Sequence, residues 1–238
     1  SPILACIKHG VPVFCEKPVE RDLRRAERIN ALIRKHHGKV QIGYVFRSMP
    51  LVIKLKSLMA DDRIHLVQSF YGCNVSLKKS LPPWFYDKEK SGGALIDQAT
   101  HNLDLLRMLI GEVVTVGGMS ANPVRKKKKG YTIEEVFALN FLFASKAAGS
   151  HVHTWVGDGW RNEIVLSGEK RIYRLNSGKG TLSVEEDGKQ TIYSQDGGSI
   201  YEHQNMIFLD MVKSGRWERN PCDYHDGLLT LKLTLACD

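Results

Sequence analysis

The stretch V-P-V-F-C-E-K-P, residues 11–18, decides the fold class of this chain. Val11 to Cys15 is short, apolar and β-prone, which is typical of a buried strand in a parallel sheet. Lys17 follows the strand end directly, and Pro18 fixes the backbone dihedral φ of the turn. Ligand crevices of open α/β sheets lie at such carboxyl strand ends. The stretch therefore predicts a parallel strand with a lysine placed for function.

Two interpretations of Glu16-Lys17-Pro18 remain open from the residues alone. In the functional one, partial desolvation lowers the pKa of Lys17 toward a value useful for proton transfer. Glu16 then holds the lysine by charge or bonds a ribose hydroxyl. In the plainer one, the tripeptide is a strand-end turn with a solvated Lys–Glu pair.

The flanking sequence predicts how the chain is organised. Residues 2–46 alternate helix, strand, helix and strand, which is the order of a doubly wound parallel sheet. After Arg47 come a helix, a strand and an apolar helix, then seven strands between residues 113 and 194, and two final helices. Many consecutive strands indicate a largely antiparallel sheet.

These patterns predict an α/β part followed by an α+β part. Residues 1–46 are expected to be the C-terminal fragment of a Rossmann-type, nucleotide-binding parallel sheet. Residues 47–238 are expected to form a larger, mostly antiparallel sheet domain with helices on one face. The chain has no G-x-G-x-x-G sequence, and a parallel sheet needs earlier βαβ units of roughly 30 residues each. A truncated chain is therefore expected.

A second motif lies about eighty residues further on, in G-G-A-L-I-D-Q-A-T-H, residues 92–101. Asp97 and His101 stand four residues apart on a predicted helix, so they share one face. The helix is otherwise apolar, and polar groups in such surroundings are paired or functional. A histidine can move a proton near neutral pH, with Asp97 orienting it or binding a substrate hydroxyl. A helix-stabilising pair is the alternative, and a metal site is not expected because the pair supplies only two ligands.

Composition and charge narrow the class of protein. The net charge of +8 includes the run Arg125 to Lys129. We interpret this run as a solvated loop tip, because no aromatic residues interleave with it to stack on bases, so no nucleic-acid partner is expected. No apolar run approaches the ~20 residues of a membrane span, and no signal peptide is recognisable, so no membrane partner is expected. The five cysteines form no C-x-x-C motif, which argues against disulfides or zinc and for a cytoplasmic protein.

Two further groups carry histidine. His151 and His153 alternate on a predicted strand, so they share one face of the sheet. We interpret them as sheet-surface residues rather than a metal pair. His225-Asp226 stands near the start of the last helix and is expected to cap it rather than reach a pocket.

Taken together, the motifs resemble those of the Gfo/Idh/MocA family of nicotinamide-dependent oxidoreductases, which includes glucose–fructose oxidoreductase and inositol 2-dehydrogenase. The resemblance runs in order from Ala5 to Gly111. It includes Glu16-Lys17-Pro18, the stretch from Gln41 to Arg47, Trp84, Ser91-Gly92-Gly93, and Asp97-x-x-x-His101 with the Asn-Leu-Asp that follows. The combination is specific, whereas each element alone is not.

The resemblance implies roles for several residues. Lys17 would contact the substrate hydroxyl and assist proton transfer, and Glu16, Lys17 and Pro18 would lie on the cofactor side. Asp97 and His101 would be the substrate-side pair, with His101 as the acid or base. Arg47 and Trp84 would line the substrate pocket.

The same resemblance implies the reaction and the partners. A hydride would pass between NAD or NADP and a sugar, cyclitol or related substrate, and the antiparallel sheet would join subunits into a homo-oligomer. The family's main cofactor loop and its ribose-reading acidic residue have no counterpart in this sequence. A non-catalytic member of the same fold, acting as a ligand-binding or scaffold protein, is the alternative.

Overall fold

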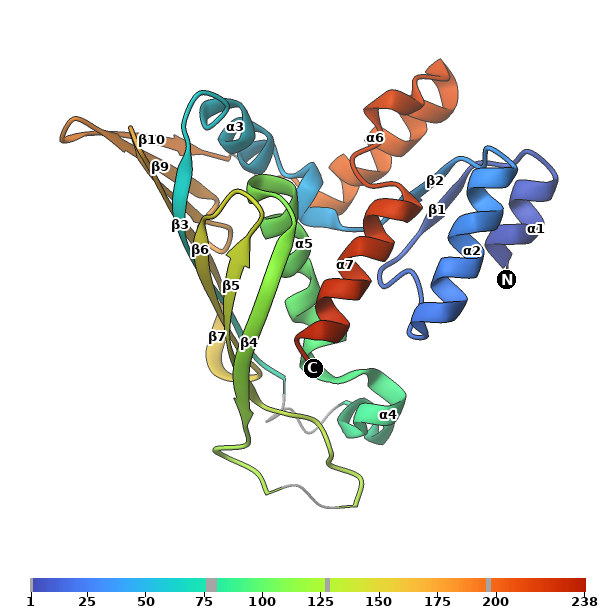
Figure 1. Cartoon of the computed structure of the whole chain (residues 1–238), viewed down its shortest axis with the longest axis horizontal. Helices are drawn as coiled ribbons and strands as arrows, with labels where there is room; N and C mark the ends of the chain where they lie inside the picture. The colour runs from blue at the N-terminus through green and yellow to red at the C-terminus, as the bar shows by residue number, and fades with distance from the viewer. Residues whose placement is uncertain (1, 76–80, 127–128, 196–197) are drawn as a thin grey trace.

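Two sheets joined by helices make up the computed structural model, which describes residues 2–75, 81–126, 129–195 and 198–238 (Figure 1). The small sheet contains β1 (Val13–Cys15) and β2 (Val40–Ile42). These strands run parallel, with Val13 opposite Val40 and Cys15 opposite Ile42. The stretch that predicted a parallel strand thus forms one, and Lys17 follows its carboxyl end.

Three helices share a hydrophobic core with the small sheet. The first two are α1 (Pro2–Lys8) and α2 (Leu23–Lys35). The start of α2 is capped by Asp22, whose Oδ1 accepts a 2.7 Å hydrogen bond from the main-chain N–H of Arg25. The third is α7 (Tyr224–Ala236), from the far end of the chain. One hydrophobic core joins these helices and both strands, including Ala26, Ile29, Ile33, Ile42, Tyr224, Leu228 and Leu231.

The large sheet has eight strands in the order β10-β9-β8-β7-β3-β6-β5-β4. One neighbouring pair, β3 and β6, is parallel, and the other neighbouring pairs are antiparallel. The strands are β3 (Ile64–Asn74), β4 (Val113–Ala121), β5 (Val136–Phe143), β6 (Ala148–Thr154), β7 (Val156–Gly168), β8 (Ile172–Asn176), β9 (Thr181–Glu186) and β10 (Lys189–Ser194). The predicted class, a parallel fragment followed by a mostly antiparallel sheet, is confirmed.

The helices lie on one face of this sheet, as predicted (Figure 1). Among the described residues, no helix covers the opposite face. The helices of the second part include η1 (Val45–Ser48), α3 (Pro50–Leu58) and α5 (Thr100–Ile110). After the last strand of the sheet, the chain continues into α6 (Ile200–Ser214) and η4 (Trp217–Arg219). The apolar side of α5 packs on the sheet, so Leu103, Leu105 and Leu106 are fully buried.

The predicted helix over residues 93–110 is interrupted at its start. A short helix, α4 (Lys88–Ser91), ends at Gly92, and both Gly92 and Gly93 have positive φ values, 83° and 67°. Next comes a π-helical turn, η3 (Leu95–Ala99), in which the N–H of Thr100 bonds the carbonyl of Leu95, five residues back. Asp97 therefore lies in a widened turn and His101 in regular α-helix.

The two histidines of β6 are not at the surface of the sheet. His151 and His153 share a face, as predicted, with ring centroids 6.0 Å apart, but both are fully buried. The reason is that their face is the one covered by α5. The surface interpretation was therefore wrong.

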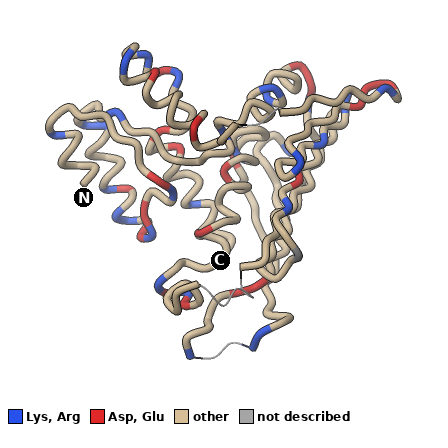
Figure 2. Tube along the Cα trace, turned by 180° about the vertical axis from the view of Figure 1, so that it is seen from behind, with Lys and Arg blue, Asp and Glu red and all other residues tan. Residues whose placement is uncertain are grey.

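The described residues of the basic run, Arg125, Lys126 and Lys129, lie in the connection between β4 and β5 (Figure 2). Lys127 and Lys128 lie outside the described residues. The guanidinium of Arg125 stacks over the ring of Tyr131, 5.3 Å from its centroid. Arg125 is thus held against its own loop by a cation–π contact.

Candidate functional site

Lys17 and Asp97 meet at the junction between the two sheets. Lys17 Nζ donates a hydrogen bond to the main-chain carbonyl of Asp97 and lies 3.5 Å from its carboxylate Oδ1. The Lys17 side chain is 15% exposed and that of Asp97 is 34% exposed. The ammonium is therefore held by a partly shielded pair of oxygens. Residues from the two sequence motifs form one site, with Lys17 following β1 and Asp97 in η3.

His101 lies one turn beyond Asp97, among aromatic rings. Its imidazole packs against Phe46, with centroids 5.2 Å apart, and edge-on against Tyr44 at 6.0 Å. Its Nδ1 is buried and has no hydrogen-bond partner among the described residues. Burial, followed by the positive charge of Lys17, lowers the pKa of His101 to about 3. The imidazole is therefore neutral at physiological pH.

Glu16 lies beside the same strand ends. An added Cβ on Gly43 would come within 2.9 Å of Glu16 Oε2. Only glycine at this position, directly after β2, lets the carboxylate lie so close to the backbone. The exposed Glu16 carboxylate and the partly buried Lys17 ammonium therefore both follow β1, and the carboxylate lies beside the end of the neighbouring β2.

Arg47 makes a different set of contacts from those expected of a pocket residue. Its guanidinium forms two 2.7 Å hydrogen bonds with the carboxylate of Asp104, and both side chains are almost fully buried. It also donates to the carboxylate of Asp226 and, at 2.7 Å, to the carbonyl of Pro221. This arginine joins η1, α5 and the start of α7.

The His225-Asp226 pair does not cap the last helix, as the sequence suggested. The capping side chain is Asp223, whose Oδ1 accepts from the N–H of Asp226 at 2.8 Å. The Asp226 carboxylate instead binds Arg47 and lies 3.4 Å from Arg107. The reason is that these two buried cations face the first turn of α7.

Trp84 is 51% exposed on the short turn η2 (Pro83–Tyr86). Its ring contacts Phe85 edge-on at 5.7 Å, and Phe85 stacks on Trp155 at 5.1 Å. Trp155 Nε1 donates a 2.6 Å hydrogen bond to the side chain of Gln98, the neighbour of Asp97. Trp84 is thus linked to η3 through two aromatic contacts and the hydrogen bond between Trp155 and Gln98.

Three residues at the site were not singled out from the sequence. Tyr44 and Phe46 pack against His101. Tyr71 on β3 packs against Phe46, with ring centroids 6.2 Å apart. Burial raises the pKa of Tyr71 to about 12, with a smaller contribution from the charge of Asp97. For Tyr44 and Phe46, the available signal was two aromatics directly after the second parallel strand.

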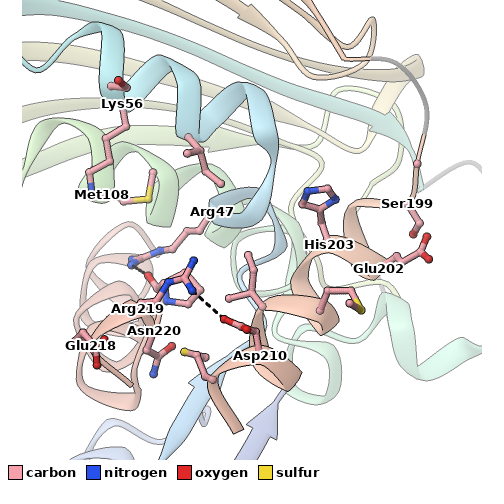
Figure 3. Close-up of a pocket in the computed structure, with 17 residues that line it drawn as sticks. Arg47, Lys56, Met108, Ser199, Glu202, His203, Asp210, Glu218, Arg219 and Asn220 are labelled. Carbon is pink, nitrogen blue, oxygen red and sulfur yellow. Dashed lines mark hydrogen bonds and ion pairs between the residues drawn. The ribbon is translucent and has the colours of Figure 1, made fainter. Parts of the chain in front are cut away.

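A separate groove of about 1050 Å³ lies between α3, α6 and η4 (Figure 3). Arg47 borders it, but Lys17, Asp97 and His101 do not. Asp210 on its wall forms a 2.9 Å ion pair with Arg219. The groove is therefore distinct from the site at the strand ends. Its apolar lining comes from Ile53, Met108, Met206, Ile207 and Met211.

The described part of the chain offers neither a cluster of metal ligands nor a membrane-spanning helix. No cluster of three or more histidine, cysteine, aspartate or glutamate side chains is placed to hold a metal ion there. None of the helices described has the length and apolar character needed to cross a membrane.

Comparison with known sequences gives one family match. The model for the GFO/IDH/MocA C-terminal domain matches residues 53–174, just over half of the chain. Inositol 2-dehydrogenase from Rhizobium meliloti is 31% identical over 224 residues, covering 93% of this chain and 58% of that protein. The uncharacterized oxidoreductase YrbE from Bacillus subtilis is 24% identical, covering 94% of this chain and 67% of that protein. The chain thus spans about two thirds or less of the length of these relatives.

Solved structures share the fold. Levoglucosan dehydrogenase in complex with NADH superposes with a TM-score of 0.83 at 18% identity, covering 99% of this chain and 73% of that one. UDP-N-acetylglucosamine 3-dehydrogenase from Acidithiobacillus ferrooxidans gives 0.82 at 17% identity, covering 98% and 71%. At this level of identity the likeness establishes the fold alone.

Proposed function

Because this chain belongs to the GFO/IDH/MocA family, we propose that it carries the catalytic side chains of an NAD(P)-dependent oxidoreductase acting on a CH–OH group. Lys17, Asp97 and His101 are the proposed catalytic residues. The observation that carries the proposal is the meeting of Lys17 with Asp97, beside a neutral His101. The names of the relatives favour this function over a scaffold role, because those with an assigned activity include several dehydrogenases.

Each side chain has a distinct task in the proposed reaction. The neutral imidazole of His101 takes the proton of the substrate hydroxyl while the C–H bond breaks and hydride leaves the carbon. The Lys17 ammonium stabilises the negative charge that develops on the oxygen. Asp97 fixes the ammonium at 3.5 Å and binds a neighbouring hydroxyl. In the reverse direction, the proton returns from His101 to the forming hydroxyl.

The strand ends fit the nicotinamide end of a cofactor. Glu16, Lys17 and Pro18 are the residues of this chain that would hold it, since crevices of open α/β sheets lie at this edge. The close approach of Glu16 to Gly43 places a carboxylate there that can bond a ribose hydroxyl. When bound, NAD or NADP supplies or accepts the hydride.

The proposed substrate is a sugar, a cyclitol or a related polyol. Inositol 2-dehydrogenase from Rhizobium meliloti and myo-inositol 2-dehydrogenase from Thermotoga maritima are named for such a substrate. The local chemistry agrees, because Lys17 and Asp97 offer a donor and an acceptor that adjacent hydroxyls can bond. Trp84 and Arg47 stay proposed pocket residues, although the contacts of Arg47 are all structural.

We also propose that the helix-free face of the large sheet joins copies of the chain. Three apolar residues on β3, β5 and β6 are exposed there: Leu66 at 41%, Leu142 at 44% and Val152 at 37%. Exposed apolar patches of this kind commonly mark protein interfaces.

The test is turnover by the complete protein with NAD or NADP and a panel of inositols and aldoses. Lys17→Met and His101→Asn should each lower kcat by about a hundredfold or more, because each removes a group that transfers or stabilises charge. Lys35→Met in α2 and His65→Asn in β3 change exposed side chains, so they are the matched controls and should retain activity. Full activity in Lys17→Met would refute the catalytic assignment.

A further inference from the structure

Each proposed substrate-side residue is followed by an amide side chain. Gln98 follows Asp97, and Asn102 follows His101. The two amides are four residues apart, the same spacing as that between Asp97 and His101. The amides point toward the large sheet, where both bond its side chains.

Gln98 is tied to two separate places in the sheet. Its Oε1 accepts from Trp155 Nε1 at 2.6 Å and from Cys73 Sγ at 2.8 Å. Trp155 is fully buried and lies between β6 and β7, and its main-chain N–H and carbonyl are both hydrogen-bonded, to Glu135 and Val75. The donors that hold Gln98 are thus themselves rigidly placed.

Asn102 makes the equivalent attachment one turn later. Its Nδ2 donates to Ser69 Oγ at 2.9 Å and to Asn162 Oδ1 at 3.3 Å, and its Oδ1 accepts from Asn162 at 2.8 Å. Asn102 and Asn162 are fully buried, and Ser69 also bonds His151 Nδ1 at 2.9 Å. Ser69 and Cys73 are both on β3, so the two amides are attached along the same strand.

This attachment bears on the site because Lys17 bonds the main-chain carbonyl of Asp97 as well as its carboxylate. The position of the π-helical turn therefore determines where the ammonium rests. A small rotation of η3 about its axis moves the Asp97 carbonyl and carboxylate together, away from Lys17. Catalytic groups displaced by about 1 Å can lose about a hundredfold in rate.

We propose that Gln98 and Asn102 are positioning residues that lock η3 and the start of α5 to the sheet, and so fix Asp97 and His101 relative to Lys17. This inference rests on the proposed function. Neither amide takes part in proton transfer. Their contribution is to hold the reacting groups in place, which affects the rate of the chemical step more than the affinity for substrate.

The test removes the hydrogen bonds of Gln98 in the complete protein. Gln98→Met removes the acceptor at nearly constant side-chain size. Trp155→Phe removes the N–H donor together with part of the indole, and leaves an aromatic ring opposite Phe85. Each should lower kcat about ten- to a hundredfold, with KM changed by less than about threefold. The double variant should lose little more activity than Gln98→Met alone, because Gln98→Met already removes the Trp155–Gln98 hydrogen bond.

The control and rescue variants separate positioning from general damage. Gln190→Met makes the same chemical change at an exposed position of the edge strand β10 and should leave kcat unchanged. Gln98→Glu keeps an acceptor for both donors and should therefore retain most of the wild-type kcat. Unchanged kcat in Gln98→Met and Trp155→Phe would overturn the proposal.

A crystal structure of Gln98→Met provides a readout that does not depend on turnover. The Lys17 Nζ to Asp97 carbonyl distance should exceed hydrogen-bond range, and an unchanged distance overturns the proposal. Lys17→Met distinguishes the two hypotheses. If it is inactive while Gln98→Met behaves as wild type, only the positioning role fails. If it is fully active, the proposed function fails, and the positioning role is judged from the crystal structure.

Discussion

Arg47 shows how a single buried residue contributes to stability. Its guanidinium is the partner of the Asp104 carboxylate, which is 1% exposed. Removing one partner of a buried ion pair leaves the other charge buried and unpaired, which costs about 3–5 kcal/mol. We therefore expect Arg47→Met to lower the free energy of unfolding by about that amount in urea titrations.

Two further variants test this explanation. Arg174→Met removes an exposed ion pair with Glu185, 3.0 Å long, and should cost less than about 1 kcal/mol. Combining Arg47→Met with Asp104→Leu removes both charges and should recover much of the stability. If the double variant were as unstable as Arg47→Met alone, the unpaired charge of Asp104 would not be the cause of the lost stability.

The elements were largely predictable because their periodicity is local. The apolar stripe of α2 and the alternation along β5 identify a helix and a strand without knowledge of the rest of the chain. The π-helical turn was not predicted, since Asp97 and His101 have the spacing of an ordinary helix face. The expected division into residues 1–46 and 47–238 stays a prediction, although α7 completes the core around the small sheet.

The contacts that build the site are not local, which limits what the sequence can show. Lys17 and Asp97 are 80 residues apart, and their meeting was expected only through the family resemblance. Arg47 has partners 57 and 179 residues away, so nothing near it in the sequence predicts a structural role. The burial of His151 and His153 likewise depends on α5, which comes from another part of the chain.

At the level of the sheet, we expect the helix-free face to control association. Leu66→Lys combined with Val152→Lys places two charges on neighbouring strands, which an apolar interface cannot bury. Light scattering coupled to size exclusion should show a smaller assembly than wild type with an unchanged circular dichroism spectrum. The matched control is Ile53→Lys, which is 52% exposed in the groove by α3 and should keep the wild-type mass. A monomeric wild type would refute this interface.

The whole molecule should be sensitive to mild acid, because two buried histidines, His151 and His153, and the half-buried His101 are held in neutral form. Burial is the main reason why the pKa of each of these histidines is low. The pKa is lowered to about 3 for His101 and to about 4 for His151, and it lies well below its ordinary value for His153. The unfolded chain takes up these protons below about pH 6.5, whereas the folded protein does not. Unfolding is therefore favoured as the pH falls from about 6.5 to 4. Stability should decrease by up to about 1.4 kcal/mol per pH unit for each histidine.

This pH dependence can be assigned to a single residue. Neither ring nitrogen of His153 has a hydrogen-bond partner among the described residues, so His153→Leu removes a titrating group without breaking a hydrogen bond. Urea titrations at about pH 7.5 and 5.5 should show a loss on the order of 4 kcal/mol for wild type and about one third less for the variant. His65→Leu, on the exposed side of β3, should keep the wild-type difference. An unchanged difference in His153→Leu would mean that the folded protein binds a proton at His153, and its burial would not then contribute to acid sensitivity.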